Sequence, residues 1–293
     1  MKRRLLEFAT AWGMLFVLAT AAAAGQVTIT FYHTSDLHEH AAPLARIAQL
    51  VQDQRTARKN VVFVDTGDWF NKGNLTPLNL RGGAMAELMG SMRYDAVIAG
   101  NHDRTHGTPR LAELVDKHSL PLTAANCTWP REATPANAKP YRVFTFDGVR
   151  VAVIGTATPV KNAGTDDLLV VRPIVPAVRK VLAELEGKAD IVCLLTHIGV
   201  PEDKRLMQAL PRLDLILGGH HHKRFARLNY NKATKTILQH SGANGQCIGE
   251  VAVVWDGEKI VSRRARLVNV TQAMPEAPAV VTVRSRYLAK PGK

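Results

Sequence analysis

Short apolar runs alternate with amphipathic stretches along most of the chain. The runs Val61–Asp65 and Ile191–Thr196 are apolar at almost every position, which is typical of strands buried on both faces. The stretch Pro43–Lys59 repeats apolar residues at helical spacing. By the same criteria we expect strands over Val27–Tyr32, Asp95–Ala99, Leu120–Ala125 and Leu213–Leu217, and helices over Gly83–Arg93, Leu111–His118, Val175–Glu186 and Glu202–Leu210.

The pattern changes after Leu217, where expected strands follow one another without helices between them. An earlier pair, Val143–Phe146 and Val149–Gly155, is expected to form a hairpin because Asp147-Gly148 between them is a strong turn dipeptide. Alternating strands and helices followed by a strand-rich end predict an α/β fold with a sheet that is mixed at its edges. The later strands are expected over Ala226–Tyr230, Thr236–His240, Ile248–Trp255 and Lys259–Val268.

Residues 1–24 are typical of a secretory signal peptide. A basic start at Lys2–Arg4 precedes the apolar run Ala9–Ala24, which ends in the small residues of an A-x-A cleavage site. The run has 16 residues, fewer than the about 20 that a membrane span needs. We therefore expect cleavage before Gly25 and a periplasmic or secreted protein without a transmembrane segment. An uncleaved anchor and twin-arginine export are the alternatives.

Composition and charge narrow the class of protein. The 293 residues are 46% hydrophobic, an ordinary globular value that excludes collagen-like and disordered chains. Lys and Arg number 38 against 25 Asp and Glu, and this net charge of +13 favours anionic partners. Residues 272–293 hold three prolines and several basic residues. We expect them to form a partly ordered basic tail that can touch anionic surfaces, after one monomeric domain at residues 25–271.

The three cysteines do not form a disulfide framework, because their number is odd and their spacing is wide. Cys193 lies in an apolar run and is expected to be buried. A bridge between Cys127 and Cys247 stays open. The sequence contains no C-x-x-C motif, which excludes thiolate zinc sites.

Residues with metal-ligand chemistry follow five of the expected strands, where ligands bind in open α/β sheets. Residues i and i+2 of an extended segment point to the same side. Asp36 and His38 are therefore expected to bind one ion together, and so are His220 and His222. A glycine before Asp68, Asn101 and His220 would allow close backbone approach. The candidate metal ligands are Asp36, His38, Asp68, Asn101, His197, His220 and His222.

Seven ligands suit a pair of metal ions. If Asp68 bridges, each ion receives four protein ligands. Two divalent ions bring a charge of about +4 and two carboxylates about −2. The remaining charge of about +2 matches that of a phosphate dianion. Mixed nitrogen and oxygen ligation suits Mn, Zn, Fe, Co or Ni.

These motifs resemble the calcineurin-like metallophosphoesterases, and most closely the catalytic domain of bacterial 5′-nucleotidases. They run in order as Asp36-x-His38, Gly67-Asp68, Gly100-Asn101-His102-Asp103, His197 and Gly219-His220-His221-His222. The resemblance implies a four-layer αββα sandwich with mixed sheets. It also implies that one ion is held by Asp36, His38, Asp68 and His222, and the other by Asp68, Asn101, His197 and His220. A metal-bridging hydroxide would then attack phosphorus in line, assisted by the non-ligand His102.

Two departures from the family pattern matter. Thr105 stands where 5′-nucleotidases carry the aspartate that pairs with the catalytic histidine, and Asn71 stands where other members carry an aspartate. The orientation of His102 is therefore expected to fall to Asp103 or to another group that the sequence does not identify. Full-length 5′-nucleotidases also carry a C-terminal domain that sandwiches the base, which we do not expect within these 293 residues, so nucleotide selectivity stays open.

The sequence thus predicts an exported, metal-dependent hydrolase of small phosphate monoesters, with nucleotides as candidate substrates. A phosphodiesterase or nuclease of the same superfamily is the alternative enzyme, although the signal segment disfavours a nucleic-acid partner. A non-enzymatic polyanion- or surface-binding protein on this fold is the third hypothesis. Asn71, Lys72 and Asn74 are candidate substrate contacts, and the packing or surface histidines are expected to be His33, His106, His118 and His240.

Overall fold

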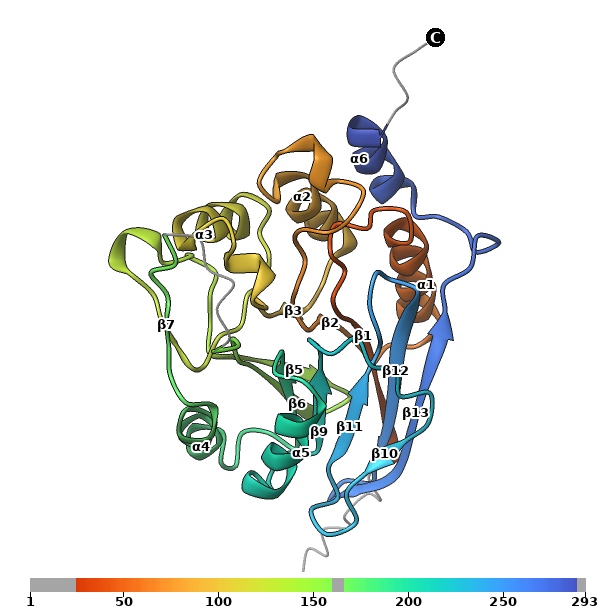
Figure 1. The fold of residues 1–293 in the computed structure, drawn as a ribbon. Coiled ribbons are helices and arrows are strands. Elements are labelled where there is room, and N and C mark those ends of the chain that lie inside the picture. Colours follow the sequence, from red (N-terminus) through yellow and green to blue (C-terminus); the bar gives the residue numbers. More distant parts are fainter. Residues whose placement is uncertain (1–24, 160–165, 289–293) are drawn as a thin grey trace, which may run out of the picture.

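Two β-sheets face each other at the centre of the molecule (Figure 1). The computed structural model describes residues 25–159 and 166–288, so the expected signal peptide lies outside the described residues. The five-stranded sheet has the order β13-β12-β1-β2-β3, with bounds Ile260–Asn269, Cys247–Trp255, Val27–Thr34, Val61–Asp65 and Ala96–Val97. The six-stranded sheet has the order β10-β11-β9-β8-β6-β5, with bounds Asn229–Tyr230, Ile237–His240, Leu215–Gly218, Ile191–Thr196, Val149–Gly155 and Tyr141–Phe146.

Helices cover the outer faces of both sheets. On the five-stranded sheet lie α1 (Leu44–Ala57), α2 (Gly83–Met92) and α3 (Thr108–Lys117), and on the six-stranded sheet lie α4 (Ile174–Glu184) and α5 (Val200–Ala209). Helix α6 (Pro278–Leu288) packs on the outside of α1 and α2. Both sheets combine parallel and antiparallel pairs, which confirms the expected four-layer αββα sandwich. Within the described ranges, no helix is long and apolar enough to span a membrane.

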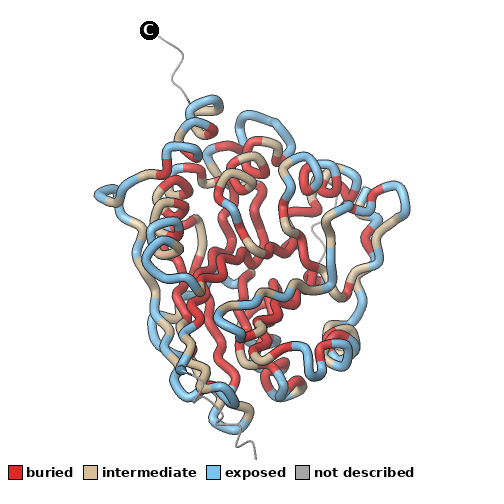
Figure 2. The backbone as a smooth tube through the Cα atoms, turned by 180° about the vertical axis from the view of Figure 1, so that it is seen from behind, coloured by how far each residue is buried: buried red, intermediate tan, exposed pale blue. Residues whose placement is uncertain are grey.

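The core between the sheets explains the uninterrupted apolar runs. Phe31, Val64 and Val251 from one sheet meet Cys193 and Leu217 from the other in a single buried cluster. The buried parts of the backbone accordingly run through the centre of the molecule in Figure 2. The predicted strands Val61–Asp65 and Ile191–Thr196 are observed with the same bounds and are buried at every residue.

The expected hairpin is confirmed. Strands β5 and β6 pair antiparallel, and Phe146 stands opposite Val149. Asp147 and Gly148 between them have φ angles of 47° and 85°, the left-handed pair that a two-residue hairpin turn requires.

The strand expected over Leu120–Ala125 is wrong. This segment crosses between the two sheets and therefore shares its backbone bonds between them. Thr123 N–H donates to the Val97 carbonyl at 2.8 Å, beside the five-stranded sheet, whereas Ala125 N–H donates to the Gly155 carbonyl at 2.7 Å, at the end of β6. Only isolated bridges form here, and the nearby paired strands are β4 (Cys127–Thr128) and β7 (Val170–Val171).

The segment expected as a basic tail contains helix α6, which the sequence pattern did not predict. Val280 and Val283 are buried in the cluster that also contains α1 and α2. Two of the basic residues form ion pairs instead of a free charged surface: Arg284 contacts Glu276 at 2.7 Å, and Arg286 contacts Glu87 at 2.7 Å.

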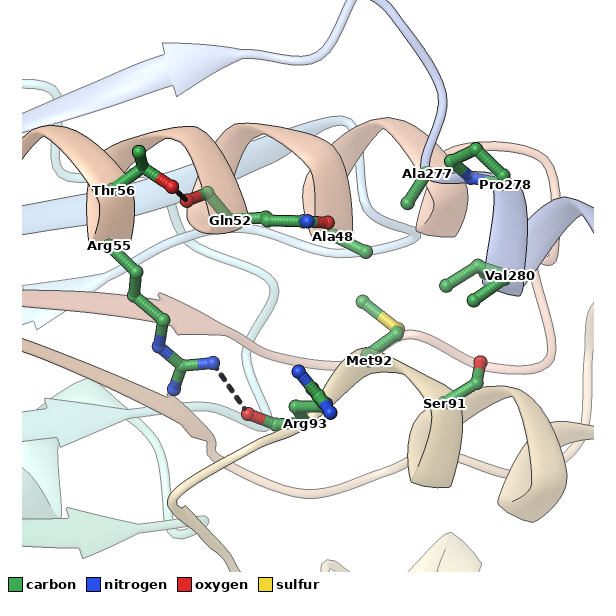
Figure 3. Close-up of a pocket in the computed structure, with 11 residues that line it drawn as sticks. Ala48, Gln52, Arg55, Thr56, Ser91, Met92, Arg93, Ala277, Pro278 and Val280 are labelled. Carbon is green, nitrogen blue, oxygen red and sulfur yellow. Dashed lines mark hydrogen bonds between the residues drawn. The ribbon is translucent and has the colours of Figure 1, made fainter.

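A cavity of about 540 Å³ lies between α6, α1 and α2. Figure 3 shows Arg55 on one side of it, with Nη1 donating to the Arg93 carbonyl at 3.0 Å, and Ala277 with Pro278 on the α6 side. Arg55 and Arg93 lie at the ends of α1 and α2 that lead into β2 and β3. The candidate ligands follow the opposite ends of β2 and β3, so this cavity lies away from them.

The three cysteines are free. The Cys127–Cys247 bridge that the sequence left open is therefore absent from the structure. Cys193 is fully buried, as expected, and Cys247 lies with its sulfur 3.2 Å from Asn269 Oδ1.

Candidate metal centre

The candidate ligands gather where five strands end, because parallel strands present their carboxyl ends at one edge of a sheet. Those that follow strands of the five-stranded sheet are Asp36, His38, Asp68 and Asn101, and those that follow strands of the six-stranded sheet are His197, His220 and His222. Most of these side chains are buried, whereas His222 is 44% exposed. The site thus lies at the junction of the two sheets.

Six of these side chains form two groups of three, and within each group the ligand atoms all lie within 4.8 Å of one another. The groups are Asp36 with His38 and His222, and Asp68 with His197 and His220. In the first group, Nε2 of His222 lies 3.3 Å from Asp36 Oδ1. In the second, Nε2 of His197 lies 3.1 Å from Asp68 Oδ2.

The two groups adjoin each other through Asp68. Its Oδ2 atom, close to His197 in its own group, is also 4.0 Å from Nε2 of His38 in the other group. The seventh candidate, Asn101, has its Oδ1 atom 3.1 Å from Nδ1 of His220. All seven residues predicted from the sequence are therefore brought together.

The orientation of the imidazoles suits metal ions. Nδ1 of His197 lies 2.7 Å from the Thr66 carbonyl and Nδ1 of His38 lies 3.3 Å from the Phe70 carbonyl. A carbonyl only accepts, so each Nδ1 carries a proton and each ring turns its Nε2 atom into the site, where a metal ion would bind it. Nε2 of His197 is fully buried and faces the Asp68 carboxylate. Nε2 of His38 lies only 3.1 Å from Nε2 of His222, a close approach of nitrogen atoms that a shared cation would stabilise.

The charges of the site favour cation binding. Burial lowers the pKa of His197, but the carboxylates of Asp68 and Asp36 raise it more, to about 9. Burial raises the pKa of Asp68, yet the neighbouring His197 charge brings it well below the usual range. Burial lowers the pKa of His38 to about 4. The ionised carboxylates and the neutral His38 are thus in the forms that divalent metals need, whereas a metal ion would displace a proton from His197.

The predicted extended conformation of these motifs is wrong. Asp36, His38, His220 and His222 all have left-handed backbones, with φ angles of 51°, 49°, 79° and 52°. Contacts from distant segments hold this conformation, since Asn244 N–H donates to the Asp36 carbonyl at 2.8 Å and His220 N–H lies 3.1 Å from Asp36 Oδ2. The side chains converge because the chain turns, and not because of the alternation of an extended strand.

The glycines before the ligands allow close backbone approach, as expected. Gly67 has a φ of 90°, and a Cβ atom there would lie 2.6 Å from the Gly100 nitrogen. A Cβ atom at Gly100 would collide with Asp68 Oδ1. The Gly-Asp and Gly-Asn loops therefore pack directly on each other.

The Asp103 carboxyl group joins the same two loops. Its oxygens accept backbone N–H groups from Asp68 at 2.8 Å, Trp69 at 2.7 Å, Phe70 at 3.2 Å and Gly100 at 2.7 Å. Burial and the Asp68 charge raise the pKa of Asp103, while these N–H groups act in the opposite direction. This geometry gives Asp103 a role in holding the loops, which differs from the expected role of orienting the His102 ring.

His102 lies beside the first group of ligands. Its ring centroid is 5.1 Å from that of His38, in an edge-to-face arrangement, and the backbone N–H of His102 donates to Asp68 Oδ1 at 2.8 Å. Burial lowers the pKa of His102, although the Asp68 carboxylate acts in the opposite direction. A neutral imidazole is thus placed next to the candidate ligands.

Two residues that support the site were not recognised in the sequence. Glu39 is buried and accepts bonds from the Asn71 N–H, at 3.1 Å, and from the Thr76 hydroxyl. His240, expected to pack or to lie at the surface near the motif-rich loops, is buried and contacts Asp203 beneath the loop that carries the last two ligands. Neither residue belongs to a repeated motif, and no signal in the sequence distinguishes them.

Comparison with known proteins agrees with this geometry. A family model described as calcineurin-like phosphoesterase matches residues 29–224. The chain is 28% identical to a snake venom 5′-nucleotidase of Crotalus adamanteus over 238 residues, which cover 70% of this chain and 39% of that protein. It is 26% identical to the trifunctional nucleotide phosphoesterase protein YfkN of Bacillus subtilis (strain 168) over 275 residues, covering 80% of this chain and 18% of that protein.

A solved structure matches most of the fold. The 5′-nucleotidase precursor from Thermus thermophilus superposes with a TM-score of 0.78 and 26% identity, covering 90% of this chain and 59% of the other. The chain spans less than half the length of the two curated relatives.

Proposed function

Because the chain belongs to the calcineurin-like phosphoesterase family, we propose that it is a two-metal hydrolase of phosphate monoesters. The observation that carries the proposal is the pair of adjoining ligand groups linked by Asp68, whose Oδ2 lies 3.1 Å from His197 and 4.0 Å from His38. Two adjacent divalent ions held there would supply Lewis acidity and would lower the pKa of a bound water.

The residues divide between the two ions. We assign Asp36, His38, Asp68 and His222 to one ion and Asp68, Asn101, His197 and His220 to the other. The backbone carbonyls of Thr66 and Phe70 hold the His197 and His38 rings in the tautomer that leaves Nε2 free for a metal. His102 donates a hydrogen bond to the phosphoryl group or a proton to the departing oxygen, since it lies beside His38 without belonging to either ligand group.

The names of the relatives suggest the class of substrate. Both the snake venom protein and the Thermus thermophilus structure are named 5′-nucleotidases. We therefore propose a nucleoside 5′-monophosphate or a similar small phosphate monoester as substrate. The signal-like sequence of residues 1–24 supports export, and we propose a periplasmic or secreted enzyme.

A metal-dependent substrate screen tests this function. The full chain is loaded with Mn²⁺ or Co²⁺ and assayed with 4-nitrophenyl phosphate, adenosine 5′-monophosphate, bis(4-nitrophenyl) phosphate and DNA. We expect faster release of phosphate from the monoesters, and loss of this activity in Asp68→Ala. Faster cleavage of the diester or of DNA would instead identify a phosphodiesterase or nuclease. Folded protein without turnover in any divalent metal would overturn the proposal.

A further inference from the structure

The loop that follows Asp68 packs against the segment that carries His38. His38 N–H donates to the Asp68 carbonyl at 3.0 Å, and a Cβ atom at Gly73 would collide with the His38 carbonyl. Leu75 N–H donates to the Glu39 carbonyl at 3.2 Å. These contacts hold residues 71–75 along the edge of the candidate metal centre.

Of the three candidate substrate contacts in this loop, Asn74 is already used by the fold. Its Oδ1 atom accepts the Ala41 N–H at 2.9 Å. The Asn71 N–H likewise donates to Glu39 Oε2, which fixes the backbone just before Lys72. The Lys72 side chain is exposed, and Lys72 forms no ion pair with any residue in the described ranges.

The backbone of Lys72 is held in an unusual conformation. Lys72 has a φ of 68° and Asn71 a φ of 67°, a left-handed region that costs a residue with a side chain of the order of 1 kcal/mol. Buried Glu39 bonds to both sides of this turn, at Asn71 and at Thr76. A lysine that follows a ligand loop and is fixed in this way projects from a defined position.

The place of Lys72 in the loop puts it close to His38. Gly73, the next residue, packs so closely on this segment that a Cβ atom there would collide with the His38 carbonyl. The Lys72 side chain therefore starts beside the pair of His38 and His102, whose rings are 5.1 Å apart. A substrate phosphoryl group held beside His102 would meet this cation.

We propose that Lys72 is a substrate-binding residue that contacts a phosphoryl oxygen of the dianionic monoester beside His102. The inference rests on the proposed function, because it takes the metal centre as the place where the phosphoryl group binds. An ammonium group attracts a dianion more strongly than a monoanion, so Lys72 would favour monoesters over diesters. It adds a protein cation to the charge of the two ions.

Kinetics and phosphate binding test the role of Lys72. In the full metal-loaded chain, Lys72→Ala should raise the KM for 4-nitrophenyl phosphate and the Kd for inorganic phosphate by about tenfold, as expected for one charge-assisted hydrogen bond. The change in kcat should stay within about threefold, because the contact exists before the chemical step. Lys72→Arg should keep most of the binding, and the content of bound metal should not change.

Lys235→Ala is the matched control. Lys235 also has a left-handed backbone, with a φ of 61°, but it lies before β11, at the end of the strand that is remote from the ligands. Equal KM and Kd values in Lys72→Ala and Lys235→Ala would overturn the inference, as would wild-type protein that binds metal but no inorganic phosphate. Phosphate binding without turnover of any monoester would instead overturn only the proposed function. Lys72→Gly also removes the charge, but glycine adopts the left-handed backbone without strain. An equal loss of phosphate binding in Lys72→Gly and Lys72→Ala therefore assigns the effect to the charge and not to the shape of the loop.

Discussion

Nε2 of His240 lies 2.7 Å from Oδ2 of Asp203, and both side chains are fully buried beneath the loop that begins at Gly218. Oδ1 of Asp203 accepts the Thr196 hydroxyl at 2.7 Å. A Cβ atom at Gly218 would lie 2.5 Å from His240 Nε2. The pair therefore supports the ends of β8 and β9, directly before the ligands His197 and His220.

Removal of Asp203 should weaken both the fold and the metal centre. Asp203→Ala leaves buried His240 and Thr196 without their partner, and we expect the free energy of unfolding to fall by about 3 kcal/mol. Urea unfolding measures this loss. Glu202→Ala is the control, because Glu202 on the same turn of α5 is exposed and pairs with the exposed Arg205. An equal effect of the two substitutions would refute the supporting role.

Asp103→Asn should disrupt metal binding. The carboxyl group accepts four backbone N–H groups, whereas an amide replaces one acceptor oxygen by a donor that faces N–H groups. We expect loss of bound metal, measured by elemental analysis, and a fall in activity of about 100-fold or more, since buried unpaired donors cost about 1–3 kcal/mol each. Asp116→Asn, at a residue that accepts one N–H on the surface, should retain full metal content.

Metal ions should raise the thermal stability of the chain. Ligand binding to the folded state alone contributes about 2.7 kcal/mol when the free ion is at 100 times its Kd. We expect the Tm to rise by several degrees on addition of Mn²⁺ to chelator-treated protein, and this rise to be much smaller in Asp68→Ala. Calorimetry at increasing Mn²⁺ provides the measurement. A Tm that is indifferent to Mn²⁺, Zn²⁺ and Co²⁺ would contradict the assignment of the ligands.

His102→Ala should separate catalysis from metal binding. The ring lies beside His38 but outside both ligand groups. We expect kcat to fall by about 100-fold or more, the usual range for removal of a general acid, with both metals retained. His118→Ala, at a half-buried histidine after α3, is the control and should keep its activity. A parallel loss of metal in His102→Ala would show that His102 supports the ligands instead.

Asp65 should make the fold less stable as the pH rises. Burial raises the pKa of Asp65 to about 7, against bonds from the Thr34 hydroxyl, the Gly67 N–H and the Trp69 indole N–H that lower it. The folded state thus holds this proton more tightly than the unfolded state. The contribution of Asp65 to the free energy of unfolding therefore falls by about 4 kcal/mol between about pH 4 and pH 7, at about 1.4 kcal/mol per pKa unit.

Asp65→Asn tests this pH dependence. The amide oxygen can accept the same two N–H groups and the amide nitrogen can donate to the Thr34 hydroxyl, as the protonated acid does. The variant should therefore gain stability relative to wild type as the pH rises from 4 to 8, and the difference should be small at pH 4. Parallel stability curves for the two proteins would show that Asp65 keeps an ordinary pKa.

The ligands could be predicted from the sequence because each follows a strongly apolar strand. The burial of β2 and β8 depends on local composition, and parallel strands necessarily bring their ends together. The turn at Asp36 and His38 could not be predicted in this way. Its left-handed conformation depends on contacts from Gly73 and Asn244, which are distant in the sequence.

Helix α6 shows a second limit of sequence patterns. Only Val280 and Val283 in it are buried, so its apolar face is narrow, and the segment begins with a proline among small and basic residues. Its position depends on tertiary contacts, such as the Ala277 N–H that donates to the Ala45 carbonyl at 2.9 Å. Local composition predicts a solvated tail here, because the packing surface is supplied by α1 and α2.

The candidate ligands belong to both sheets. Asp36 and Asp68 follow strands of the five-stranded sheet, whereas His197 and His220 follow strands of the six-stranded sheet. Ions that bind all of them would fasten the two halves of the sandwich at one end of their shared core, as a cross-link does. We therefore expect metal starvation to increase digestion of the folded chain by proteases, so that metal supply would govern the lifetime of the protein as well as its turnover.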